Sequence, residues 1–100
     1  MKILALEQDV AGFRAEDFKP HLKAESARVW ELYQAGVLRE LYFRANRHSA
    51  VLILECATME EAATVLSTLP LVEQGLITFD VIPLVAYPGF ARLFAEEKSQ

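Results

Sequence analysis

One glutamate lies in the middle of an apolar stripe on a predicted helix. At about 100° per residue, one side of that helix carries the apolar residues Phe18, Leu22, Val29, Leu32 and Tyr33. Glu25 falls near the centre of this stripe. A carboxylate packed against apolar side chains has a raised pKa, which suits a general base working near neutral pH. The alternative is that Glu25 pairs with an arginine where the helix overhangs the sheet.

A second group of candidate residues lies on an alternating segment, residues 37–45. Its two faces separate as Val37, Leu41, Phe43 and Ala45 on one side, and Leu38, Glu40, Tyr42 and Arg44 on the other. We expect the first set to pack under the helices, with Arg39 on that face near its edge. The second set is expected to point between the sheet and a partner, where Glu40, Tyr42 and Arg44 would line a small-molecule site. The alternative is an edge strand whose charges face water.

The turn that follows this segment, "NRHS", adds Arg47 and His48 at the mouth of the expected site. His48 would donate to an anionic substrate, although turn histidines are also common on plain surfaces. Trp30 and Tyr33 on the helix would supply aromatic walls beside Tyr42.

The sequence gives little support for a metal site or for a phosphate-binding site. The two histidines, His21 and His48, are far apart and have no carboxylate at ligand spacing. The sequence contains no Gly-rich phosphate loop and no Gly-x-Ser-x-Gly elbow. We therefore expect no metal site.

The elements that must position these residues follow from periodicity and from start and stop signals. Strands are expected over residues 2–10, 37–45, 50–56 and 76–87, with Pro83 favouring an edge or a bulge. The first helix is expected from Glu16 to Ala35, stopped by Gly36. The second is expected to begin at Thr58, which has capping-box spacing to Glu61, and to be closed by Pro70.

This order, β-α-β-β-α-β, predicts an α+β, ferredoxin-like fold with a four-stranded antiparallel sheet and two helices on one face. The third strand is apolar on both sides, with Val51 and Ile53 opposite Leu52 and Leu54. A sheet with one face in water would alternate. We therefore expect a second subunit to cover the open face, giving a dimeric α+β barrel.

Composition limits the class of protein. The 100 residues predict one domain, residues 1–88, followed by a C-terminal tail, residues 89–100. Hydrophobic residues make up 53% of the chain, which suggests an oligomer contact. The net charge of −4 argues against nucleic-acid and anionic-membrane binding. The single cysteine, Cys56, and a short N-terminal apolar run broken by Glu7 favour a cytoplasmic protein.

With these features in place, the chain resembles the muconolactone isomerase family from about Leu22 to Pro88. The resemblance includes Glu25, Gly36, the segment "LRELYFRANRH", the "LPL" at residues 69–71 and the aromatic-Pro pair at residues 87–88. The "LPL" motif and the spacing from Glu25 to Gly36 are together the most specific parts of this resemblance.

The resemblance implies a ferredoxin-like fold and a cofactor-free proton shift within an unsaturated, carboxylated lactone. A base removes a proton next to the carbonyl, cations hold the carboxylate and the enolate, and the proton returns elsewhere. It places Glu25 as the base, Arg44 as an anion-holding group and His48 in a supporting role. "LYFR" has one residue more than the family spacing, so Arg44 faces the site only if a bulge absorbs it.

Two other functions remain open at this point. A cofactor-free monooxygenase acting on an aromatic, polyketide-like substrate would use the same architecture and aromatic walls. A non-catalytic ligand-binding or assembly protein would hold Glu25 and Arg44 as a buried ion pair. A direct contact between Glu25 and Arg44 with no cavity beside them would favour the non-catalytic protein. A cavity that both residues face would favour an acid–base enzyme.

Overall fold

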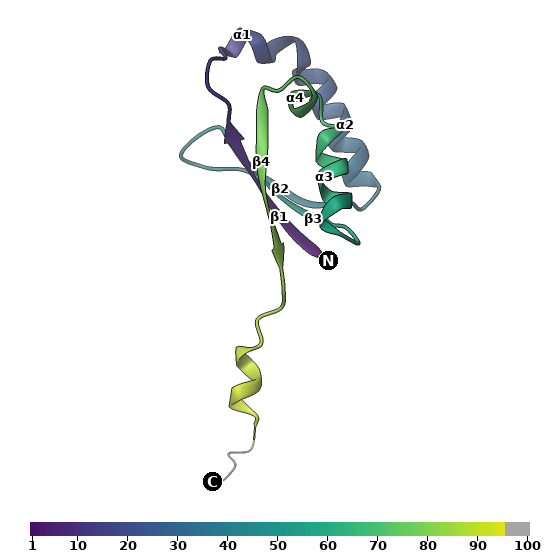
Figure 1. Cartoon of the computed structure of the whole chain (residues 1–100), viewed down its shortest axis with the longest axis vertical. Helices are drawn as coiled ribbons and strands as arrows, with labels where there is room; N and C mark the ends of the chain where they lie inside the picture. The colour runs from purple at the N-terminus through teal and green to yellow at the C-terminus, as the bar shows by residue number, and fades with distance from the viewer. Residues whose placement is uncertain (96–100) are drawn as a thin grey trace.

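Four antiparallel strands form one sheet in the computed structural model, which describes residues 1–95 (Figure 1). The strand order is β2-β3-β1-β4, so the first and third strands lie in the centre. The strands are β1 (Lys2–Asp9), β2 (Leu38–Phe43), β3 (Ala50–Glu55) and β4 (Ile77–Leu84). The proline-containing strand β4 is an edge strand, as the sequence predicted.

The longer helices cover one face of this sheet, with α2 and α3 side by side in Figure 1. The helical segments are α1 (Ala15–Phe18), η1 (Lys19–His21), α2 (Leu22–Gln34), α3 (Met59–Ser67), α4 (Pro70–Glu73) and η2 (Gly89–Leu93). Their apolar sides meet the sheet in a main core, where Leu32 and Leu66 pack with Ile3 and Leu54, and in a smaller cluster around Leu71. Burial of each such side chain contributes about 1.5–3 kcal/mol. The predicted ferredoxin-like α+β fold is confirmed.

The first helix is not continuous, contrary to the prediction. Pro20 has no backbone N–H to donate, and the chain passes from α1 through the short 3₁₀ turn η1 before α2 begins at Leu22. The predicted stop is confirmed, because Gly36 adopts a φ of 77° that favours glycine. The N–H groups of Gly36 and Val37 then bond back to Tyr33 and Leu32, which completes a Schellman cap.

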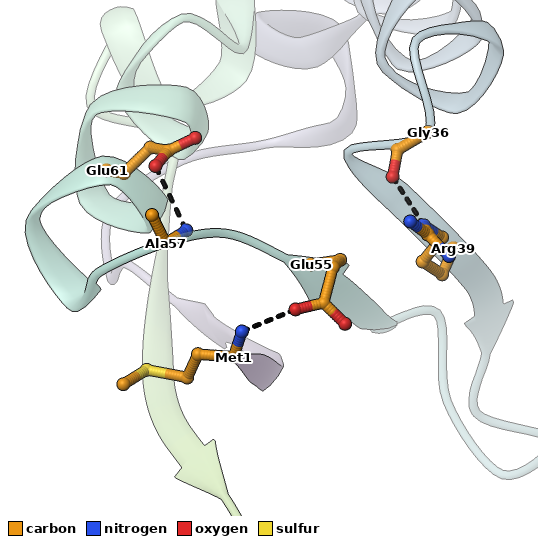
Figure 2. A network of polar contacts seen from close by, with 6 residues as sticks. All are labelled: Met1, Gly36, Arg39, Glu55, Ala57 and Glu61. Atoms are coloured by element: carbon orange, nitrogen blue, oxygen red, sulfur yellow. Dashed lines mark hydrogen bonds and ion pairs between the residues drawn. The ribbon is translucent and has the colours of Figure 1, made fainter.

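The second helix begins as predicted and ends earlier. The Thr58 hydroxyl accepts a hydrogen bond from the Glu61 N–H at 3.1 Å. The Glu61 carboxylate in turn accepts from the Ala57 N–H at 3.0 Å (Figure 2). Pro70 does not close this helix, because α3 ends at Ser67 and Pro70 is the first residue of α4. Proline suits that position because the first N–H of a helix has no intrahelical partner.

A bulge near the start of β2 changes which side chains face the core. Leu38 pairs with Leu54 and Glu40 pairs with Ile53, so Arg39 is an extra residue in the strand. Figure 2 shows Arg39 reaching back, where its Nε donates to the Gly36 carbonyl. Leu38 was expected to share a face with Glu40, and this was wrong, because Leu38 is buried at 2% exposure in the core.

The sheet face that no helix covers is called the open face below. Strand alternation and the pairing register place six aliphatic residues on it: Leu4, Leu6, Val51, Ile53, Ile82 and Leu84. These side chains are half-buried by their neighbours. The predicted apolar character of both sheet faces is therefore present in the structure.

The chain beyond β4 leaves the sheet and ends in η2, which lies away from the strands and helices in Figure 1. Its rings Tyr87 and Phe90 contact each other edge to face at 5.1 Å. The expected tail over residues 89–100 is described only as far as residue 95, and residues 96–100 lie outside the described part. Within the described residues, no helix has the length and apolar character needed to cross a membrane.

Candidate active site

A large cavity lies between the first helical region and the sheet face that the helices cover. Its volume is about 990 Å³. Most of the lining is apolar or aromatic, which is typical of small-molecule sites. The lining residues are Glu7, Asp9, Ala15, Phe18, Leu22, Glu25, Ser26, Val29, Trp30, Tyr33, Leu41, Tyr42, Phe43, His48, Ala50, Leu71, Ile77 and Phe79.

Glu25 projects from the first turn of α2 into the wall of this cavity. Its Oε1 accepts a hydrogen bond from the Leu71 N–H of α4 at 2.9 Å. Burial raises the pKa of Glu25, the Leu71 N–H partly opposes that rise, and the negative charge of Glu7 adds to it. None of the ion pairs in the described part of the chain involves Glu25, so the expected alternative of an arginine partner is not what the structure contains.

Glu7 connects the cavity wall to the loop between β2 and β3. Its Oε1 accepts from the Ala50 N–H at 3.0 Å, and its carbonyl accepts from the Ser49 hydroxyl at 3.1 Å. Ser49 is only 2% exposed. These two bonds hold the end of the loop against β1, directly after His48.

Aromatic rings form two walls of the cavity. The His48 ring packs on Phe43 with centroids 4.2 Å apart. Trp30 and Tyr33 stack at 6.0 Å on α2. All four rings are partly exposed to solvent, which is the exposure expected of side chains that meet a ligand rather than the core.

Five of the eight residues proposed from the sequence border this cavity: Glu25, Trp30, Tyr33, Tyr42 and His48. The Tyr42 hydroxyl donates to Glu40 at 2.8 Å, and this bond raises the pKa of Tyr42. Glu40, Arg44 and Arg47 are exposed and do not line the cavity. Glu25 and Arg44 form no ion pair within the described residues.

The cavity lies on the opposite side of the sheet from the one we expected. The sequence predicted a site between the open face and a partner, lined by Glu40, Tyr42 and Arg44. Leu41 pairs with buried Leu52 and faces the helices, as the alternation predicted, whereas Glu40 pairs with Ile53 on the open face. Glu40 thus points away from the cavity that Glu25 borders.

Two carboxylates of the site were missed in the sequence. Glu7 was interpreted only as a polar residue that interrupts an apolar run, and neither Glu7 nor Asp9 was assigned to the site. Their spacing from Ile3 and Ala5 places all four on one face of β1, and that face covers the core before it reaches the cavity. The period-2 pattern therefore held the signal that both side chains point under the helices.

A family model for muconolactone delta-isomerase matches residues 6–89. The chain belongs to the muconolactone delta-isomerase family. The matched residues include the end of β1, the elements from α1 to β4 and every residue that lines the cavity. No curated protein is similar enough to this chain to count as a match.

Solved structures show the same fold as this member of the muconolactone delta-isomerase family. A crystal structure of muconolactone isomerase is 19% identical, with a TM-score of 0.70 over 88% of this chain and 92% of the other. The 5-chloro-2-hydroxyhydroquinone dehydrochlorinase of Burkholderia phenoliruptrix, in complex with 2,5-dihydroxybenzoquinone, is 16% identical. Its TM-score is 0.68 over 89% of this chain and 98% of the other.

Proposed function

We propose that this chain catalyses a cofactor-free proton shift within a small enolisable ring, of the lactone class that its family description names. One observation carries the proposal. A carboxylate with a raised pKa, Glu25, borders a large apolar cavity and has a backbone N–H as its hydrogen-bond partner. A carboxylate that only stabilised the fold would be expected to meet a cation.

In the proposed reaction, Glu25 accepts a C–H proton from a ring carbon conjugated with the carbonyl. The electron pair of that C–H bond moves toward the carbonyl oxygen and forms an enolate. Glu25, now a carboxylic acid, returns its proton to another carbon of the conjugated system, so that no atom is gained or lost. Leu71 holds Oε1, which leaves Oε2 to exchange the proton.

His48 takes the supporting position in this proposal. Its ring borders the same cavity as Glu25 and is oriented by its contact with Phe43. An imidazole that donates to the enolate oxygen lowers the barrier by stabilising the developing charge. Arg44 and Arg47 have no role in the proposed reaction, because neither side chain lines the cavity.

Turnover of a lactone tests the proposed function directly. We expect the purified protein, treated with a chelator, to convert muconolactone or its methyl ester into an isomeric lactone, followed by proton NMR. Conversion of both compounds at the rate of a heat-denatured control would contradict catalysis. Binding without conversion would support the non-catalytic alternative.

We also propose that the protein works as a homo-oligomer in the cytoplasm. The open face is apolar, and residues 85–94 expose further large apolar side chains, with Phe94 at 84% exposure. Contiguous apolar surfaces of this kind are typical of interaction sites between proteins. A second copy covering the open face would give the dimeric barrel that the sequence predicted.

Replacing Ile53 with aspartate should therefore shift the protein to a monomer of 11.3 kDa. The new charge would be buried at the centre of the proposed contact without a partner. Light scattering after size exclusion measures the mass. Ala63→Asp adds the same charge on the exposed side of α3 and should leave the mass of the oligomer unchanged. A wild-type monomer, or an Ile53→Asp oligomer, would overturn the proposed contact.

A further inference from the structure

The charged groups that border the cavity are all of one sign. Glu7 and Asp9 at the end of β1 join Glu25 of α2 on its wall. Within residues 1–95, no lysine or arginine lines it. Arg44, to which the resemblance gave an anion-holding role, and Arg47, expected at the mouth of the site, both lie outside the lining.

A substrate carboxylate would meet these charges at close range. In the proposed reaction Glu25 must enter each cycle deprotonated, so it contributes a negative charge at the moment of binding. Two like charges several ångströms apart near a protein surface weaken binding on the order of tenfold to a hundredfold. An apolar wall offers no counter-charge to offset that repulsion.

We infer that the cavity takes an uncharged enolisable ring in preference to one that carries a carboxylate. This inference rests on the proposed function and narrows its substrate class. The carboxylated lactone implied by the family resemblance thus becomes the poorer ligand. The apolar and aromatic lining then provides the binding energy through contact with the ring, while Glu25 and His48 meet its polar atoms.

Two ligands of nearly the same shape separate the alternatives: muconolactone, which is an anion, and its uncharged methyl ester. Trp30 is the only tryptophan of the chain and borders the cavity, so its fluorescence reports occupancy. Titrations at pH 8, above the usual range of histidine titration, should give at least about tenfold tighter binding of the ester.

A charge variant tests the cause of that preference. Glu7→Gln retains an oxygen that can accept from the Ala50 N–H and removes one negative charge from the wall. It should tighten binding of the acid several-fold more than it changes binding of the ester. Glu40→Gln removes the same charge outside the lining and should change neither affinity.

The outcomes distinguish this inference from the proposed function. Binding of the acid as tight as or tighter than that of the ester would overturn the inference and would indicate a cation supplied by another copy of the chain. Equal effects of Glu7→Gln and Glu40→Gln would also overturn it, since net charge alone would then be the cause. Isomerisation of either lactone would still support the proposed function in both cases.

Discussion

Replacing Glu25 with glutamine is expected to lower kcat/KM for lactone isomerisation by more than about a hundredfold. Glutamine retains an oxygen for the Leu71 N–H and nearly the same volume, but it cannot accept a proton from carbon at neutral pH. The loss should appear in kcat, because the ring still fits the cavity. Steady-state kinetics on both lactones measures it.

The unfolding temperature of the same variant shows whether any loss of activity is due to misfolding. Burial raises the pKa of Glu25 above its ordinary value of 4.5. The folded state therefore binds this proton more tightly than the unfolded chain, so the stability that Glu25 contributes is complete at low pH and is lost as the pH rises through the raised pKa. At pH 8, Glu25→Gln should unfold at the same temperature as wild type or higher. Activity within a few-fold of wild type would remove Glu25 from the mechanism.

Truncating Leu38 to alanine is expected to lower the free energy of unfolding by about 2–5 kcal/mol, the range for a large buried side chain. Leu38 is 2% exposed and packs in the main core, although it lies on the edge strand β2. Chemical denaturation gives this value directly.

Arg39→Ala is the matched comparison, one residue further along the same strand. Its side chain is exposed and makes one hydrogen bond to the Gly36 carbonyl, so the loss should be about 1 kcal/mol or less. A larger loss for Arg39→Ala than for Leu38→Ala would contradict the bulge and restore the simple alternation read from the sequence.

Local signals made the fold predictable. Gly36 ends its helix because its left-handed backbone conformation suits glycine, and Thr58 begins the next helix because its hydroxyl can accept an N–H. Alternation and helical periodicity placed every strand within a few residues. The helix boundaries at Pro20 and Pro70 were harder to predict, since a proline can either interrupt a helix or begin one.

The site was predictable only in part. Glu25 could be singled out from the sequence because a charge within an apolar stripe is visible in the pattern of a single helix, without knowledge of the rest of the fold. Glu40 lies on the open face as predicted, but the cavity lies on the other face of the sheet. The placement of Leu38 failed because the bulge at Arg39 depends on pairing with β3, which one strand alone does not reveal. Glu7 acquires its role only through contacts with Ser49 and Ala50, more than forty residues away.

Charge and architecture together refine what the family membership implies. The chain has the ferredoxin-like fold and a glutamate at the wall of the cavity, and Glu7 and Asp9 in the lining are the charges that we infer repel an anionic substrate. Members of one fold can differ in substrate through such lining residues, because the fold positions a site without fixing its ligand.

Hydrogen exchange at the substrate tests the central claim that Glu25 moves a proton on carbon without a cofactor. The chelator-treated protein is incubated in heavy water with muconolactone and, separately, with its methyl ester, and deuterium in the ring is followed by NMR. We predict deuterium incorporation at ring carbons by the wild type and at least about a hundredfold slower incorporation by Glu25→Gln. Neither incorporation nor isomerisation of either lactone by the wild type, or equal rates of both for the variant, would contradict the account.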